Sequence, residues 1–171
     1  MSITNNFTTN TPIAVSVGPQ NVEKRYAATE AQIEVWLSSL QSVEANCAYN
    51  EIASLVFDGD LDSDRLKEAI DKVVQRHGSL RSTFSDDGQQ VIVRDSVNYG
   101  FESVDFRSGL NVELEQAVQE VIIDQACTPF DLVNGPLFRV VLQQISDNKH
   151  KLTIAAHHLV LDGWSLAVFC T

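Results

Sequence analysis

Basic residues are scarce in this 171-residue chain. Lysine and arginine number 12 against 23 aspartates and glutamates, so the formal net charge is -11 at pH 7. Nucleic acids and anionic membrane surfaces bind proteins through clusters of basic side chains, so we expect neither as a partner. No apolar run approaches the roughly 20 residues that a membrane-spanning helix needs. The first 20 residues also lack the positive charge that opens a secretory signal peptide, which favours a cytoplasmic protein.

Cysteine is sparse as well, and its three copies lie far apart. Cys47, Cys127 and Cys170 form no C-x-x-C pair, which argues against a zinc site and against a disulfide scaffold. The sequence also lacks a glycine-rich phosphate loop and a serine-centred nucleophile elbow. We therefore expect no metal and no bound cofactor. We expect the three cysteines to be reduced thiols, which are typical of cytoplasmic proteins.

The remaining composition is that of an ordinary globular protein, with 44% hydrophobic and 20% charged residues. The length suffices for one domain with its own core. Residues 1–24 are rich in Ser, Thr, Asn and Pro and show no periodicity, which is typical of a flexible segment. Residues 25–171 alternate between helical and strand patterns without repeats or an internal linker.

Three helices are predicted from apolar spacing and capping signals. The first, residues 29–43, begins with a Thr-x-x-Gln capping box. The second begins at Asp62 or Ser63 and ends at Gly78 in the left-handed conformation. The third covers residues 111–127, because Pro129 follows it. Helical spacing predicts that the apolar face of the first helix consists of Ile33, Trp36, Leu37 and Leu40.

Strands are predicted where short runs of β-branched and aromatic residues lie between turn signals. Asp86-Asp87-Gly88 and Asp147-Asn148 each predict a hairpin turn. The expected strands are residues 52–57, 80–85, 89–95, 99–104, 137–145 and 151–156. Helices and strands alternate without strict strand-helix-strand spacing. This pattern predicts an α+β fold, a two-layer α/β sandwich in which helices pack on one face of a mixed sheet.

The stretch from His157 to Gly163 carries the strongest chemical signal, because it joins a predicted strand to a predicted helix. A neutral imidazole can accept a proton at cellular pH. Neighbouring residues on an extended chain point in opposite directions, so one of His157 and His158 can face a cleft while the other is buried. Asp162 can fold back on the loop or pair with an arginine, and Gly163 permits a positive φ or a close ligand. The alternative is a pair of core histidines before a simple turn.

Three motifs in this order resemble those of condensation domains of nonribosomal peptide synthetases, members of the chloramphenicol-acetyltransferase-like superfamily. Residues 29–37 are similar to the first motif of that family. Residues 76–84 resemble its RHExLRTxF motif, with Gly78 in place of Glu and Ser82 in place of Thr. Residues 157–163 match HHxxxDG. The resemblance extends over residues 26–171 and implies the N-terminal lobe of such a domain.

The resemblance implies a reaction in which the α-amine of a carrier-bound acceptor attacks the thioester of a carrier-bound donor, forming an amide. It makes His158 the candidate that holds the amine and accepts its proton. It places His157 on the opposite face as a loop anchor and gives Asp162 a structural role. Gly163 would let the substrate arm pass close to the backbone, and Trp164-Ser165 would lie near the oxyanion.

Structural support and partners are implied in the same way. Arg76 and Arg81 would brace the fold, although Gly78 removes a carboxylate that this motif usually has. The partners would be peptidyl or acyl carrier protein domains and other synthetase modules. The phosphopantetheine arm belongs to those carriers, so the resemblance implies no cofactor held by this chain.

Two other functions remain open. One is a coenzyme-A-dependent acyltransferase of the same superfamily, in which His158 would serve equally well. The other is a non-catalytic remnant or docking module, because condensation domains are considerably longer than this chain. Thr171 falls within a predicted helix and no cap follows it, which indicates a truncated chain. We expect such a fragment to be inactive by itself.

Overall fold

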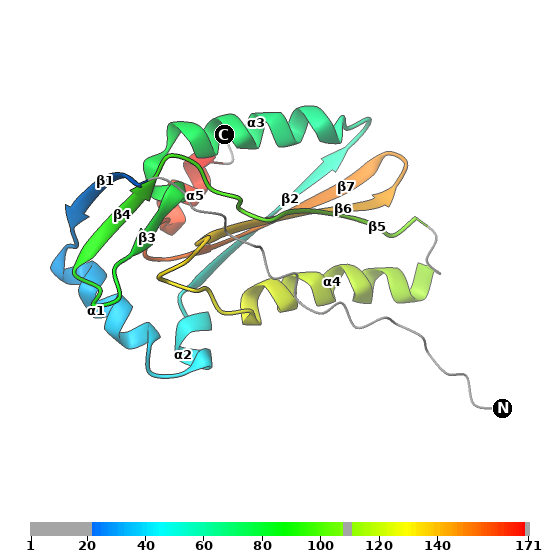
Figure 1. Cartoon of the computed structure of the whole chain (residues 1–171). Coiled ribbons are helices and arrows are strands. Elements are labelled where there is room, and N and C mark those ends of the chain that lie inside the picture. The colour runs from blue at the N-terminus through cyan, green and yellow to red at the C-terminus, as the bar shows by residue number, and fades with distance from the viewer. Residues whose placement is uncertain (1–21, 108–110, 170–171) are drawn as a thin grey trace.

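The computed structural model describes residues 22–107 and 111–169, which form two β-sheets with helices packed against them (Figure 1). We expected residues 1–24 to be flexible. Residues 1–21 of this segment lie outside the described residues. Its last three residues depart from that expectation, because β1 (Val22–Ala27) pairs antiparallel with β4 (Gln90–Arg94). Pairing with β4 orders a stretch in which the sequence shows no apolar alternation.

The larger sheet has the strand order β2-β7-β6-β5. It consists of β2 (Asn50–Asp58), β5 (Phe101–Asp105), β6 (Phe138–Ser146) and β7 (Lys149–His157). β7 is antiparallel to both β2 and β6, whereas β5 joins β6 in parallel, so the sheet is mixed as predicted. The hairpin at Asp147-Asn148 is confirmed.

The smaller sheet has the order β1-β4-β3 and contains the other predicted hairpin. β3 (Ser82–Phe84) pairs antiparallel with β4 around the Asp86-Asp87-Gly88 turn. Gly88 has a φ of 69°, and a Cβ at this position would lie 2.5 Å from the ring of Trp36. The turn therefore requires glycine both for its backbone conformation and for its contact with the first helix.

The described helices are α1 (Glu30–Ser39), α2 (Val43–Cys47), α3 (Ser63–Arg76), α4 (Asn111–Cys127) and α5 (Gly163–Phe169). The capping box of Thr29 and Gln32 is confirmed, and so is the cap at Asp62. The predicted helix 29–43 is wrong at its C-terminal end, because Ser42 caps the separate helix α2. Gly78 does not adopt a positive φ. It begins a short 3-10 helix (Gly78–Arg81) instead.

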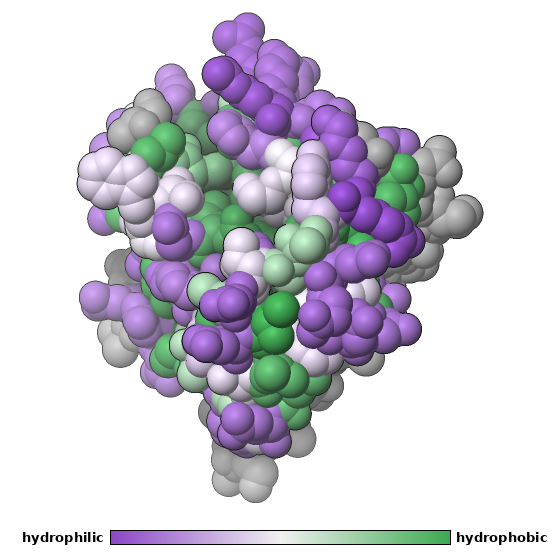
Figure 2. Space-filling model, turned by 90° about the vertical axis from the view of Figure 1, so that its left-hand side faces the viewer, coloured by the Kyte–Doolittle hydropathy of each residue, from purple (hydrophilic) through white to green (hydrophobic). Residues whose placement is uncertain are grey.

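The predicted apolar face of α1 is only partly buried. Trp36 is 6% exposed, whereas Leu37 and Leu40 are more than half exposed. The side of the molecule that carries β1 and α1 accordingly shows apolar side chains among hydrophilic ones (Figure 2). Helical spacing identifies a stripe of apolar residues, but the position of the helix at the margin of the fold decides how much of that stripe is covered.

Helices cover both faces of the larger sheet, rather than the single face that we expected (Figure 1). On one face, Leu152 and Ile154 pack with Ile70 and Val74 of α3. On the other face, the buried Gln143 side chain donates a hydrogen bond to a backbone carbonyl of α4, with an Nε2 to oxygen distance of 3.1 Å. Both faces of the central strands are buried, so both need a helix. The α+β class itself is confirmed.

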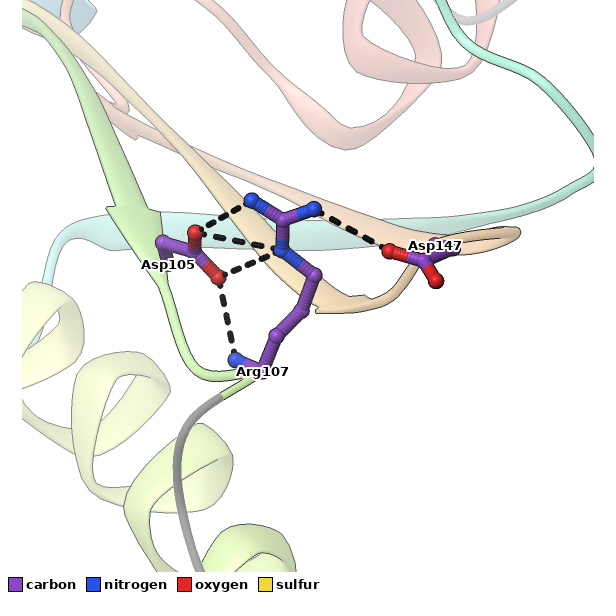
Figure 3. A network of polar contacts seen from close by, with 3 residues as sticks. All are labelled: Asp105, Arg107 and Asp147. Carbon is purple, nitrogen blue, oxygen red and sulfur yellow. Dashed lines mark hydrogen bonds and ion pairs between the residues drawn. The ribbon is translucent and has the colours of Figure 1, made fainter.

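An exposed charge cluster lies at the start of β7. Arg107 binds Asp105 at the end of β5 and Asp147 in the β6-β7 turn, with N to O distances of 2.7 and 3.0 Å (Figure 3). Hydrogen bonds from Arg107 lower the pKa of Asp105 to about 2. The histidine pair lies at the opposite end of the same strand, so this cluster is not part of the candidate site.

None of the helices in the described part of the chain is long and apolar enough to cross a membrane. The described residues also bring no three His, Cys, Asp or Glu side chains together as a metal centre would require.

Candidate active site at the end of strand β7

The histidine loop joins the end of β7 to α5 and is tied to two other segments. The backbone N–H of His158 donates to the carbonyl of Tyr49, at 2.8 Å, which continues the pairing of β7 with β2. The Gln32 side chain of α1 donates to the carbonyl of Leu159, at 3.5 Å. Within the loop, the N–H of Val160 donates to the carbonyl of His157. The loop is therefore positioned by strand pairing and by the first turn of α1.

His157 lies inside the protein on the α4 side of the sheet. Its side chain is 0% exposed and contacts the rings of Tyr49 and Phe130. Its Nε2 lies 3.3 Å from the Oγ of Ser39, and its Nδ1 lies 3.3 Å from the backbone nitrogen of Leu159. Both ring nitrogens therefore have protein partners.

These partners determine where the proton of His157 lies. The Ser39 hydroxyl donates its only proton to the carbonyl of Val35, at 2.7 Å, so its oxygen accepts from Nε2–H of His157. Nδ1 accepts from the N–H of Leu159, so this nitrogen carries no proton. Burial, and secondarily the nearby His158, lowers the pKa of His157 to about 4. His157 is therefore neutral at cellular pH, and its bond from the N–H of Leu159 connects the buried ring to the loop.

His158 points to the other face of the sheet and is solvent-accessible. Its Nδ1 lies 3.0 Å from Oε1 of Glu51, and the two side chains are 41% and 36% exposed. No other described residue binds the His158 ring. The alternation along β7 thus separates the two histidines as the sequence predicts, and it leaves Nε2 of His158 as the nitrogen open to a substrate.

An open hollow of about 320 Å³ lies beside His158. Thr29 and Gln32 line it from the start of α1, and residues 158–162 with Ser165 line it from the loop. The hollow brings the first motif of the chain into the same site as the histidine motif.

Asp162 caps α5 and does not form the arginine pair that we considered. Its Oδ1 accepts from the N–H of Ser165 at 2.7 Å, and its carbonyl accepts from the N–H of Leu166 at 2.8 Å. No arginine of the described residues pairs with it. Hydrogen bonds from Ser165, through the side chain first and the backbone second, lower the pKa of Asp162. The carboxylate holds the loop to the helix that follows.

We expect Asp162→Ala to lower the melting temperature by a few degrees, because the first turn of α5 loses its cap. Asp162→Asn should melt close to wild type, because asparagine caps helices about as well as aspartate. Differential scanning calorimetry of the two variants at pH 7 checks this. Equal destabilisation by Ala and Asn would show that the charge, rather than the cap, holds the loop.

Gly163 is the first residue of α5, and its φ is not positive. Of the two alternatives considered for Gly163, the positive φ is therefore wrong. A Cβ built on Gly163 would meet no atom within 4 Å, so this position is open in the described structure, and close approach of a ligand stays a prediction. Trp164 is 81% exposed, and the N–H of Ser165 is already bound by Asp162, which argues against that N–H as an oxyanion donor.

Arg76 and Arg81 lie away from the histidine loop. The buried Arg81 donates to the carbonyls of Val74, Gln75 and Arg94, so it ties the C-terminal turn of α3 to β4. Arg76 is the exposed last residue of α3. Both line a separate hollow that shares no residue with the one beside His158.

Two polar side chains that bind the histidine rings through an oxygen atom were not predicted from the sequence. Glu51 binds His158 and Ser39 binds His157. Glu51 stands at the start of an apolar strand and Ser39 at the end of an amphipathic helix, where such residues are common without a special role. Only the pairing of β2 with β7 and the packing of α1 bring them to the site.

Comparison with known proteins identifies the family. The model of the condensation domain matches residues 22–171. A linear gramicidin synthase of Brevibacillus parabrevis is 36% identical over 141 residues, which are 81% of this chain and 2% of that protein. Chondramide synthase cmdD of Chondromyces crocatus is 34% identical over 143 residues, 82% of this chain and 4% of that protein. This chain therefore spans only a few per cent of these relatives.

Solved structures show the same fold. The starter condensation domain of rhizomide synthetase RzmA superposes with a TM-score of 0.77 at 23% identity, covering 86% of this chain and 35% of that one. The first condensation domain of the CDA synthetase gives a TM-score of 0.73 at 24% identity, covering 87% and 38%. Since the family model matches residues 22–171, with HHxxxDG at the end of β7, this chain belongs to the condensation-domain family.

Proposed function

We propose that this chain supplies the histidine-bearing part of a site that forms an amide between a donor thioester and the α-amine of an acceptor aminoacyl group. The observation that carries the proposal is the state of His158. It stands at a strand end beside an open hollow, with Nδ1 held by Glu51 and Nε2 directed to no described residue. A ring nitrogen in this state can bind and deprotonate an incoming amine.

The chemistry requires such a group. An α-amine has a pKa near ~8, so much of it is protonated at neutral pH, and it attacks a carbonyl only as the free amine. His158 accepts the proton that the amine loses as the tetrahedral adduct forms. His157 is unsuited to this role, because it is buried and both of its nitrogens are engaged.

The proposed partners are peptidyl or acyl carrier protein domains and neighbouring synthetase modules, in accordance with the synthases among its relatives. Both substrates would arrive as thioesters on the phosphopantetheine arms of carriers, and the chain would hold no cofactor of its own. We place the activity in the cytoplasm, which the free thiols of Cys47 and Cys127 support. Cys170 lies outside the described residues.

A coenzyme-A-dependent acyltransfer is the second candidate. One structural neighbour, a variant of the starter condensation domain of RzmA, was solved in complex with C8-CoA, at a TM-score of 0.76 and 21% identity. The hollow beside His158 is open, so it would admit either kind of thioester. Apart from His158, its lining has no basic side chain that would favour the phosphates of coenzyme A.

A donor competition assay on the full-length gene product tests the proposal. The same acyl group is offered on a carrier protein and on coenzyme A, with a carrier-bound aminoacyl acceptor. We expect kcat/KM to be at least about tenfold higher for the carrier-bound donor, a difference of ~1.4 kcal/mol in the barrier. A preference for coenzyme A would establish the second candidate. Absence of any amide from either donor would leave the non-catalytic module as the answer.

A further inference from the structure

We propose that Glu51 is a positioning residue for His158, which fixes the neutral imidazole in the Nδ1–H tautomer and thereby presents the lone pair of Nε2 to the hollow. The inference deepens the proposed function and rests on it as far as catalysis is concerned. The tautomer itself is a property of this chain and can be measured without substrate.

The register of β2 against β7 places the two side chains together. Glu51 pairs with Ala156, and the N–H of His158 bonds to the carbonyl of Tyr49. Glu51 and His158 are therefore diagonal neighbours on one face of the sheet, a separation that long side chains can bridge. The Oε1 to Nδ1 distance of 3.0 Å shows that they do.

The start of β2 is itself fixed, so Glu51 is presented on a rigid backbone. The side chain of Asn50 donates to the carbonyls of Ala126 and Thr128, at 2.9 and 3.0 Å. These bonds tie the first residue of β2 to the C-terminal end of α4. Because the backbone is fixed, only the side chains of Glu51 and His158 can rotate.

Glu51 is also the carboxylate whose geometry suits this role. The other nearby acid, Asp162, uses its Oδ1 to cap α5 at Ser165. The carboxylate of Glu51 only accepts hydrogen bonds. When the imidazole of His158 is neutral, its single N–H proton must therefore lie on Nδ1. A neutral imidazole then has its acceptor at Nε2, as a base that removes a proton from an amine requires.

A carboxylate that sets the tautomer of a catalytic histidine can contribute much to a rate. In the serine-protease triad, replacing the buried aspartate by asparagine lowers kcat by about 10⁴-fold, because the histidine adopts the wrong tautomer. Glu51 is 36% exposed rather than buried, so the amide of Glu51→Gln can turn its oxygen towards Nδ1. Glu51 and His158 are both about two-fifths exposed, so water can replace part of the interaction. We therefore expect a smaller effect, on the order of a tenfold loss of kcat in Glu51→Ala.

The tautomer is tested by long-range ¹H–¹⁵N NMR of histidine-labelled protein above pH ~8, well above the reference pKa of ~6.5 for an imidazole in model peptides. The chain has four histidines, so the spectrum of His158→Gln assigns the signals of His158. We expect Nδ1–H in the wild type and in Glu51→Gln, whose amide oxygen still accepts. We expect Nε2–H, the form that prevails in free histidine, in Glu51→Ala. Nδ1–H in Glu51→Ala, or Nε2–H in the wild type, would overturn the proposal.

The catalytic consequence is measured as kcat and KM for amide formation by the full-length gene product. Glu51→Ala should lose about tenfold in kcat with little change in KM, and Glu51→Gln should recover most of it. Asp58→Ala, which removes a carboxylate from the other end of β2, is the matched control and should match wild type. Equal losses in Glu51→Ala and Glu51→Gln would overturn the tautomer account.

Failure of this inference is distinguishable from failure of the proposed function. Wild-type protein that forms no amide, or His158→Ala that remains active, would overturn the proposed function while the NMR result stands. Active wild type and inactive His158→Ala, combined with a fully active Glu51→Ala, would overturn only the role of Glu51.

Discussion

His158→Ala should lower the rate of amide formation by ~10² to 10⁴-fold, the range that a positioned acid or base contributes. The reason lies in the state of the two histidines. His158 alone combines solvent access with an uncommitted nitrogen, whereas His157 has both nitrogens bound and is completely buried. No other described side chain that lines the hollow has a basic nitrogen.

The variant should fold normally, which makes the measurement clean. Truncating a side chain that is 41% exposed leaves no enclosed cavity, and the partner Glu51 becomes solvated rather than a buried unpaired charge. Single-turnover product formation by the full-length gene product is the readout, with thermal melting as the check on folding. His77→Ala, which removes an exposed histidine at the end of α3, is the matched control and should retain wild-type activity. A His158→Ala rate within tenfold of wild type, or ~1.4 kcal/mol in barrier, would contradict an essential role.

The parts of this fold that sequence predicts well are those set by local signals. The bounds of α4 agree with the prediction, because the apolar pattern is sustained and Pro129 follows it. Both hairpins form at their predicted turns, since Gly88 and Asp147-Asn148 lie between strong strand patterns. The opposite orientations of His157 and His158 follow from strand alternation alone.

The parts that sequence did not predict depend on which distant segment lies alongside. β1 has no apolar alternation and is ordered by its hydrogen bonds to β4. Leu37 and Leu40 belong to an apolar stripe that the rest of the described fold leaves exposed. The contact of Glu51 with His158 requires the register of β2 on β7, which cross-strand packing sets and no local motif encodes.

His157→Phe should change the pH dependence of stability more than any other single substitution in the site. In the folded protein the pKa of His157 is lowered to about 4, from an ordinary value of 6.5, chiefly by burial. Between pH 4 and pH 6.5, His157 is therefore protonated in the unfolded chain and neutral in the folded chain. The contribution of neutral His157 to stability is complete above pH 6.5 and is lost as pH falls towards 4.

The magnitude follows from the size of the shift. A difference of about 2.5 units corresponds to roughly 3 kcal/mol across the whole window, of which about 2 kcal/mol is lost between pH 7.5 and pH 5. Phenylalanine keeps most of the ring volume and does not titrate, but it leaves the N–H of Leu159 without its acceptor. Such an unsatisfied buried group costs ~1–3 kcal/mol, so His157→Phe should be less stable than wild type at pH 7.5.

Together, these two effects predict that the stabilities of wild type and His157→Phe converge as the pH falls. Urea unfolding at pH 7.5 and at pH 5 should show the wild type losing about 2 kcal/mol more than His157→Phe over this interval, so that the two proteins become nearly equal in stability at the lower pH. The carboxylates titrate equally in both proteins and cancel in the difference. His77→Gln, at an exposed histidine, should follow the wild type throughout. Parallel stability curves for wild type and His157→Phe would mean that His157 accepts a proton in the folded protein as readily as in the unfolded chain. The bonds to Ser39 and Leu159 would then not hold it neutral.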